Sequence, residues 1–367
     1  MDFYPSNMRT EWIVVAALAM VALVGVSYWL GTQNDSINEP GDLPNTPGRG
    51  PGTTIPPRND IPPSVPPVIE TEEFPPLPEG ITYDYGAKFE PPAGRVVHGI
   101  GQWDEYNEKY LALLNQSNYP ASELIFIQIG ESDRPWAPAK LKAQVFKVGN
   151  AGEIPSMNIT LSGNQPTQAE LDKLPDPLFG IDDEVVNSTK YDSRIQDIID
   201  IAKEYKKPIM MRIGGEFNGW WNGYHPYEYP KAYQKIVQMF RDAGADNVAF
   251  IWCYEPAAPN DFDEKNVLGQ YKWFPGNDYI DWYSIDLYAT NDISGAEKTA
   301  NGTLTSYGKT LRFLDMAVKA QKPVIIAESG SAFVDITPGD ADGKNDWDAW
   351  FKPYFNLIHT HPEIKWF

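Results

Sequence analysis

From residue 95 onward, short apolar runs alternate with segments of helical periodicity, and this alternation restricts the fold more than any other feature of the chain. The strand candidates are Val96–Gly101, Leu124–Gly130, Ile154–Leu161, Pro208–Gly214, Val248–Tyr254, Tyr279–Tyr288, Pro323–Glu328 and Ile364–Phe367. Strands that alternate with helices indicate parallel β/α units, and eight such strands predict an α/β fold of the (β/α)8 TIM-barrel type. The chain ends within the last strand. A barrel left open at this point would expose a strand edge, so we expect that the eighth unit is truncated and that the rest of its strand and its helix are missing.

The N-terminal region contains an uncharged apolar run, Trp12–Leu30. Its 19 residues would reach ~28 Å as a helix, close to the hydrocarbon thickness of a bilayer. We therefore predict an uncleaved transmembrane signal anchor over residues 12–30, with a cleaved secretory signal as the alternative. Arg9 is the only basic residue before the run, which predicts a short cytoplasmic N-terminus over residues 1–11 and an extracytoplasmic domain beyond the membrane.

Residues 31–93 have a different composition. Of the 33 prolines in the chain, 15 lie between Pro40 and Pro92. Such a segment buries too little apolar surface to fold, and its prolines favour extended polyproline II, so we predict a semi-rigid linker. Its last part, Ile81–Phe89, is richer in aromatic residues and is expected to pack on the barrel domain, which spans residues 94–367.

Charge and cysteine content exclude several classes of function. The formal net charge of −20 disfavours nucleic acid and anionic membrane surfaces as partners. The single cysteine, Cys253, rules out an intrachain disulfide, and the four histidines show no metal-ligand spacing. We therefore predict no metal in the site and no cofactor. Calcium at the oxygen-rich segment Asp340–Asp348 is the weaker alternative to a helix cap at Asn345 or Asp346.

Strand parity indicates which side chains point into the barrel, because alternate residues of a strand face opposite sides. The inward sets are predicted to be Met210, Arg212, Gly214 and Glu216 in the fourth strand, Trp252 and Tyr254 in the fifth, Trp282, Ser284, Asp286 and Tyr288 in the sixth, and Val324, Ile326 and Glu328 in the seventh. Cys253 is expected to face outward against a helix as a buried thiol.

Two glutamates, Glu216 and Glu328, end the fourth and seventh strands, where barrel active sites lie. Glycoside hydrolysis needs such a pair: one carboxylic acid protonates the leaving oxygen, and the other carboxylate attacks the anomeric carbon or activates water. A structural alternative is that each glutamate is a strand-end charge paired with a lysine or arginine. Two glutamates at matching positions with aromatic residues nearby favour the catalytic interpretation.

Three segments carry a resemblance to a known family: Arg212–Trp221, Trp273–Tyr288 and Lys322–Gly330, which occur in the expected order. From about residue 95 onward the chain resembles retaining (β/α)8 glycoside hydrolases with catalytic glutamates on strands four and seven, and most of all family 26. That family includes β-mannanases, β-1,3-1,4-glucanases and some β-1,3-xylanases. The mannanases carry histidine where this chain has Gly215, so the resemblance indicates hydrolysis more strongly than it indicates mannan as the substrate.

The resemblance implies Glu216 as the acid/base and Glu328 as the nucleophile, with Tyr288 holding the nucleophile through a hydrogen bond. Arg212 is expected to favour an ionised Glu328. The candidate substrate-binding residues are Arg212, Asn218, Trp220, Trp221, Trp252, Trp273, Trp282, Asp286 and Tyr288.

The sequence thus predicts a membrane-anchored, extracytoplasmic, endo-acting retaining β-glycosidase that hydrolyses a β-mannan or β-1,3-1,4-glucan type of polysaccharide. One alternative is a non-catalytic carbohydrate-binding or adhesion protein on the same barrel. Another is a hydrolase that trims the cell's own exopolysaccharide, for which a membrane tether is a better argument than for foraging.

Overall fold

The computed structural model describes residues 83–101, 104–112, 114, 119–130, 135–163, 178–330 and 347–367. The predicted anchor, the linker up to residue 82 and most of the Asp340–Asp348 segment lie outside these residues. Among the helices that the structure describes, none has both the length and the hydropathy needed to span a bilayer.

Eight parallel strands form one sheet in sequence order, as the alternation predicted. They are β1 (Gly99–Ile100), β2 (Ser122–Gln128), β3 (Ile154–Thr160), β4 (Ile209–Glu216), β5 (Val248–Tyr254), β6 (Trp282–Leu287), β7 (Val324–Ser329) and β8 (Ile364–Trp366). Every neighbouring pair from β1 to β8 is parallel, so the carboxyl ends of all strands open onto the same face of the barrel.

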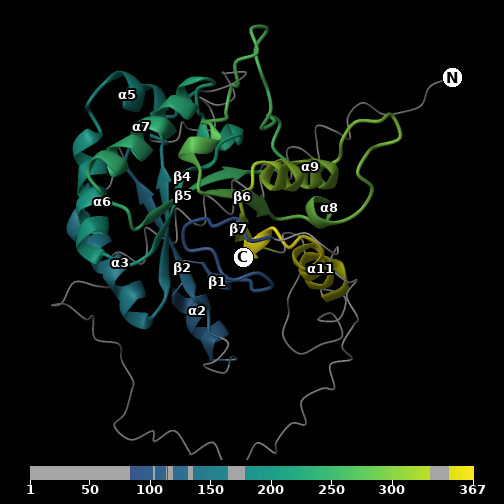
Figure 1. Ribbon diagram of the computed structural model, residues 1–367, viewed down its shortest axis with the longest axis horizontal. Helices are drawn as coiled ribbons and strands as arrows, with labels where there is room; N and C mark the ends of the chain where they lie inside the picture. The colour runs from purple at the N-terminus through teal and green to yellow at the C-terminus, as the bar shows by residue number, and fades with distance from the viewer. Residues whose placement is uncertain are drawn as a thin grey trace, which may run out of the picture. The chain divides into compact units, whose positions relative to one another are not determined.

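Helices connect the strands and lie outside them (Figure 1). They are α2 (Asp104–Leu111), α3 (Pro138–Ala151), α5 (Asp182–Asn187), α6 (Asp192–Tyr205), α7 (Glu228–Asp242), α8 (Thr290–Ile293), α9 (Ser306–Lys319) and α11 (Lys352–Thr360). Shorter helical turns occur at Trp220–Asn222, Asn277–Tyr279 and Trp347–Phe351. Helix α9 shows why such segments are helical: Thr305 caps its first turn by accepting from Gly308 N, and Phe313, Leu314 and Ala317 form its buried stripe.

The eighth strand is formed, which corrects the expectation that the barrel is open at this strand. It pairs with β7, and Trp366 also forms a parallel bridge with Val97 just before β1. Backbone bonds from Val97 N to the Lys365 carbonyl (2.9 Å) and from Phe367 N to the Val97 carbonyl (2.9 Å) join the two ends of the sheet. The barrel is therefore nearly closed, which removes most of the exposed edge that an open sheet would have.

Two separate apolar clusters stabilise the barrel. The larger one lies between the strands and the helices and includes the apolar face of α6, formed by Ile195, Ile198, Ile199, Ala202 and Tyr205. The smaller one fills the amino-terminal half of the barrel and consists of Met210, Ala249, Ile251, Trp282, Ile325 and Trp366. The interior below the active-site face is therefore a packed core and not a pore, as expected for this fold.

These clusters test the predicted strand parity. The prediction is confirmed for β6 and for Met210 and Arg212 in β4, but it is wrong for β5, where Ala249 and Ile251 face inward and Trp252 and Tyr254 face the helices. Every residue of β5 is buried, so its sequence contains no polar–apolar alternation from which parity could be read.

In β7, Ile325 faces inward while Val324 and Ile326 face outward, again contrary to the prediction. The register with β6 shifts after Ile326, where Ile285 pairs with Ile326 but Asp286 pairs with Glu328. This irregularity adds one residue to β7 and so returns Glu328 to the inner side of the barrel.

The first described residues close the amino-terminal end of the barrel. Phe89 packs against the inner cluster, and the Lys88 carbonyl accepts a hydrogen bond from Trp282 Nε1 at 2.8 Å. Glu90 accepts from the backbone N–H groups of Tyr85 and Ala87 and forms a buried ion pair with Lys365. The expected packing of Ile81–Phe89 on the barrel is thus confirmed for residues 83–89.

Candidate active site

Glu216 owes its position to a bulge near the end of β4. Between Arg212 and Glu216 the strand advances four residues, while its partner β5 advances two, from Ile251 to Cys253. Gly214 and Gly215 occupy the left-handed region with φ of 87° and 56°, which glycine adopts without the steric cost that other residues incur. The two glycines therefore serve the backbone turn that presents Glu216 at the mouth of the barrel.

Arg212 is the centre of a buried network. Its Nε donates to Asn158 Oδ1 at 3.0 Å, its Nη1 donates to Asp286 Oδ2 at 2.6 Å, and its Nη2 donates to Glu328. Burial by itself lowers the pKa of Arg212, but Asp286 and the other anions around it raise the pKa on balance. The guanidinium is a fixed positive charge that joins β3, β4, β6 and β7, and it contacts Glu328, the carboxylate that it was expected to keep ionised.

Three carboxyl groups converge on this arginine. Oxygen atoms of Glu216, Asp286 and Glu328 all lie within 4.8 Å of one another. Burial raises the pKa of Asp286 to about 8, the charge of Arg212 opposes that shift, and Glu216 adds to it through its charge and a carboxyl–carboxyl hydrogen bond. The raised pKa of Asp286 indicates that this cluster of three carboxyls and one guanidinium retains a proton near neutral pH.

Both oxygens of Glu328 are held. Tyr288 donates its hydroxyl to Oε2 at 2.9 Å, as the resemblance implied, and Arg212 donates to Oε1. The backbone N–H of Glu328 donates to Asp286 Oδ1 at 2.8 Å, which orients the strand end. Burial, followed by the charges of Asp286 and Glu216, raises the pKa of Tyr288 well above its usual value, so the phenol remains a donor. The side chain of Glu328 is 23% exposed and so can be reached from the barrel mouth.

Four of the predicted substrate contacts are wrong. Trp252 and Trp273 are buried in the core between strands and helices, and Trp252 stacks on Phe217 with ring centroids 4.4 Å apart. Trp282 lies in the inner cluster against Trp366, near the amino-terminal end of the barrel. Asn218 is fully buried, and its side chain bonds the backbone of Glu255 and Asn260.

Trp220 and Trp221 remain candidate sugar platforms. They form a short helical turn just after Glu216, are partly exposed, and meet edge to face with centroids 6.0 Å apart. Phe126 is a further aromatic residue that the sequence did not single out. Its ring lies 5.9 Å from the Arg212 guanidinium carbon and is 39% exposed. These aromatic side chains therefore lie beside the carboxyl cluster, Trp220 and Trp221 just after Glu216 and Phe126 next to Arg212.

Cys253 faces the barrel interior and not a helix, which corrects the prediction. Its Sγ lies 3.5 Å from Arg212 Nη1, and it accepts from the Ser284 hydroxyl at 3.3 Å. Burial raises the pKa of Cys253 well above its usual value, so the group is a neutral thiol beneath the carboxyl cluster.

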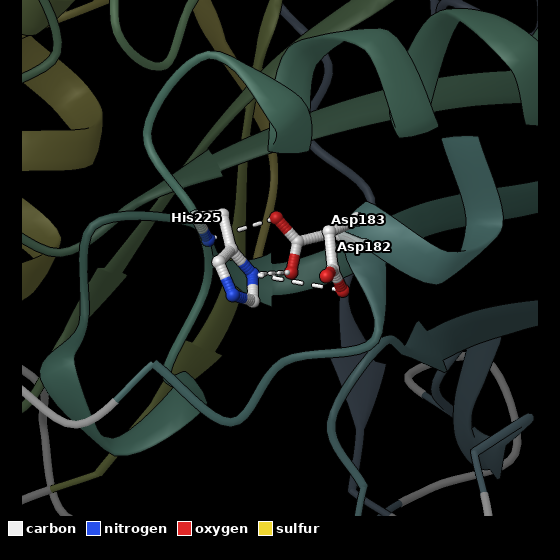
Figure 2. Close-up of side chains that lie close together, drawn as sticks. All are labelled: Asp182, Asp183 and His225. Atoms are coloured by element: carbon white, nitrogen blue, oxygen red, sulfur yellow. Dashed lines mark hydrogen bonds and ion pairs between the residues drawn. The ribbon is translucent and has the colours of Figure 1, made fainter. Parts of the chain in front are cut away.

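A second group of titratable residues lies in the connections after β3 and β4 (Figure 2): Asp182 and Asp183 begin α5, and His225 precedes α7. Asp182 Oδ1 is 2.9 Å from His225 Nδ1, and Asp182 Oδ2 accepts from His225 N at 2.8 Å. Burial raises the pKa of Asp182, while the hydrogen bonds from His225 oppose the shift. The residue types suit a metal, but His225 already satisfies both Asp182 oxygens, so the group acts as a link between the two loops.

Comparison with known proteins agrees with this geometry. Residues 162–361 match the model of glycosyl hydrolase family 26. The chain belongs to this family. The matched region contains Arg212, Glu216, Asp286, Tyr288 and Glu328, so the carboxyl cluster falls within the family domain.

Curated relatives include a β-1,3-xylanase from a Vibrio species, 26% identical over 196 residues, which is 49% of this chain and 38% of the relative. A β-1,3-xylanase from an Alcaligenes species is 24% identical, covering 48% of this chain and 37% of the relative. Endoglucanase H of Acetivibrio thermocellus is 30% identical over 48% of this chain and 19% of the relative. The chain thus spans less than two-fifths of the length of each of these relatives.

Solved structures of family 26 proteins share the fold. A mannanase from Bacillus subtilis has a TM-score of 0.50 at 16% identity, with 76% of this chain and 80% of that chain covered. The catalytic domain of an endo-β-1,4-mannanase from Bacillus sp. JAMB-750 has a TM-score of 0.50 at 17% identity, with 74% and 76% covered. At this identity the likeness supports the barrel architecture alone.

Sequence reasoning missed three polar residues around this family 26 site: Asn158, Cys253 and Glu255. Asn158 had a signal, because Ser156, Asn158 and Thr160 alternate with apolar residues in β3 and so mark its inner face. Cys253 had none, because its strand is buried on both faces. Glu255 follows β5 directly and is a third strand-end glutamate that could have been noticed.

Proposed function

We propose that the chain is a retaining, endo-acting β-glycanase in which Glu328 is the nucleophile and Glu216 is the acid/base. The observation that carries the proposal is the approach of these two carboxyls at the carboxyl end of the barrel, with oxygens within 4.8 Å. Retaining glycosidases hold their two carboxyls about 5–5.5 Å apart, whereas inverting enzymes leave room for a water between them. A non-catalytic binding barrel would need no such pair.

In this mechanism Glu328 attacks the anomeric carbon while Glu216 gives a proton to the departing oxygen. Arg212 and Tyr288 direct the attacking carboxylate by bonding its two oxygens. Water then enters, Glu216 removes its proton, and the glycosyl–Glu328 ester is broken with the β configuration restored.

For the substrate we propose a β-linked polysaccharide, with β-1,3-xylan, mixed-linkage glucan and β-mannan as the candidates. Two of the relatives are named β-1,3-xylanases, a third is named an endoglucanase, and the structural neighbours are mannanases. Gly215 has φ of 56°, and a Cβ added there would lie 3.7 Å from Asn158 Oδ1. A side chain at this position would thus be strained by the backbone and not by crowding, which supports a subsite shaped differently from that of the mannanases.

The catalytic assignment is tested by Glu216→Ala and Glu328→Ala in the complete protein. We expect Glu328→Ala to abolish turnover and Glu216→Ala to lower kcat by about 10²–10⁴-fold, the usual contribution of a general acid–base. Reducing ends released from the three polysaccharides are measured, and the anomer of the first product is followed by NMR. Glu204→Ala, at an exposed glutamate of α6, is the control. Hydrolysis that survives both changes, or an α anomer as first product, would contradict the proposal.

We also propose that Trp12–Leu30 anchors the protein and that the barrel acts outside the membrane. The support is the uncharged run of 19 residues followed by a proline-rich segment. After cell lysis and alkaline carbonate washing, the full chain is expected in the membrane fraction, and a chain without residues 1–30 in the supernatant. Recovery of both chains in the supernatant would refute the anchor.

A further inference from the structure

Two buried carboxyls outside the proposed mechanism lie at the same face of the barrel. Glu255 immediately follows β5, and Asp292 lies in the short helix α8 after β6. They are only 2% and 1% exposed. Burying a charged carboxylate is costly unless the charge is paired, so the state of these two groups needs a physical account.

Each group has one bonded oxygen and one buried oxygen without a partner. Glu255 Oε1 accepts from Ala257 N at 2.9 Å, and Asp292 Oδ2 accepts from Ala289 N at 2.8 Å and Tyr288 N at 3.3 Å. Within the described part of the chain, Glu255 Oε2 and Asp292 Oδ1 have no hydrogen-bond partner. Asp292 therefore accepts two backbone hydrogen bonds and Glu255 accepts one, so a negative charge is better stabilised on Asp292.

The surroundings supply negative charge and no direct cation. Among the described residues, the nearby cations bond elsewhere: Lys309 Nζ donates to the Ala258 carbonyl, and Arg312 pairs with Asp261 and Asp263. Burial raises the pKa of Glu255 well above its usual value, and the charges of Asp292, Glu216 and Asp286 add to the shift. Burial also raises the pKa of Asp292, but the hydrogen bonds from the backbone of Ala289 and Tyr288 oppose the shift. Tyr254 and Tyr288 are close enough to feel the charge of Glu255, and both are neutral phenols because burial raises their pKa values.

We propose that Glu255 and Asp292 are positioning residues in different charge states, with Glu255, which accepts one backbone hydrogen bond, the neutral acid and Asp292, which accepts two, the carboxylate. The Asp292 carboxylate fixes the backbone of Tyr288, whose hydroxyl bonds Glu328. The backbone at Glu255 exchanges hydrogen bonds with the Asn218 side chain, two residues after Glu216. The Glu255 side chain holds the turn after β5 by accepting from Ala257 N, so we infer that its neutral state keeps the Asn218 bonds, and through them the region of Glu216, in place. Only the effect on the catalytic glutamates rests on the proposed function.

The protonation of Glu255 in the folded protein is tested by the pH dependence of the free energy of unfolding. An unfolded glutamate ionises near pH 4.3, whereas the proposal has folded Glu255 keep its proton, so the contribution of Glu255 to wild-type stability should fall as pH rises above ~4.3 until the folded group ionises. Glu255→Gln removes this titration while keeping the shape, so its unfolding free energy is expected to fall less from pH 5 to pH 9. Glu297→Gln, at an exposed glutamate, is the matched control. Parallel curves for wild type and Glu255→Gln would overturn the proposal.

The positioning is tested by amide hydrogen exchange and by kinetics. At neutral pH, exchange at Tyr288 and Ala289 is expected to quicken at least ten-fold in Glu255→Ala and to stay near wild type in Glu255→Gln. Turnover of the active polysaccharide should follow the same order, with kcat lowered ten-fold or more in the alanine variant, KM little changed, and kcat restored by glutamine. Unchanged exchange in the alanine variant, or equal loss in both variants, would refute the positioning role. The exchange result decides this even if the wild type hydrolyses no glycan, which would refute the proposed function alone.

Discussion

At the scale of single residues, Arg212 organises the site. One guanidinium bonds Asn158, Asp286 and Glu328, and these three side chains come from three different strands. Because it is buried and paired, loss of this charge would leave the carboxyl cluster of Glu328, Asp286 and Glu216 without its cation, at a cost of about 3–5 kcal/mol for a broken buried pair. The same arginine supports both the fold and the proposed chemistry.

Tyr288 offers the sharpest test at this scale. Tyr288→Phe removes the hydroxyl that bonds Glu328 Oε2 and leaves the ring in place. A hydrogen bond to a charged group contributes ~1.5–3 kcal/mol, so we expect kcat to fall by about 10–100-fold. The control is Tyr283→Phe on the same sheet, whose hydroxyl bonds Asn277. Equal kcat values for Tyr288→Phe and wild type would show that the bond does not orient the nucleophile.

At the scale of an element, the end of β4 shows how backbone conformation positions a carboxylate. The bulge lengthens the strand by two residues relative to β5, and glycines with positive φ make it possible. Gly214 has little space around it, because a Cβ there would lie 2.6 Å from Tyr229 Cε2. Gly215 has ordinary clearance.

This difference predicts an order of effects. We expect Gly215→Ala to cost about 1–2 kcal/mol, the usual penalty of a left-handed residue. Gly214→Ala should cost more than that, because the clash with Tyr229 adds to the penalty. Urea unfolding gives the free energies, and kcat reports the displacement of Glu216. If Gly214→Ala proved the milder change, the bulge would not depend on close packing against Tyr229.

At the scale of the whole molecule, the barrel depends on a segment from before its first strand. Residues 83–90 close its amino-terminal end, and Glu90 neutralises the buried Lys365 of β8. The last part of the proline-rich region is thereby included in the folded unit.

Truncation tests this dependence. We expect a chain without residues 1–82 to unfold at nearly the same urea concentration as the full chain. A chain without residues 1–93 should lose about 3–5 kcal/mol, because Lys365 is left as an unpaired buried charge. Glu90→Gln, which removes only the charge, should show most of that loss. Equal stability of the two truncated chains would mean that the segment is dispensable.

The sequence by itself determined the order of strands and helices and the two glutamates at the ends of β4 and β7. Period and spacing are local properties, so eight β/α units could be counted before any contact was known. The arginine–carboxyl contacts were partly foreseeable, because Arg212 and Glu216 share a strand face and Asp286 and Tyr288 share another.

Only the tertiary structure decided which apolar residues face inward. In β5 both faces are buried and carry the same chemistry, so Trp252 was assigned to the site and Cys253 to the helices, and both assignments were wrong. In β7 an irregularity reverses the parity before Glu328. Burial also separated the tryptophans, because Trp273 and Trp282 look like sugar platforms in sequence but lie in the cores. Such distinctions depend on which surfaces meet after folding, and no local pattern contains that information.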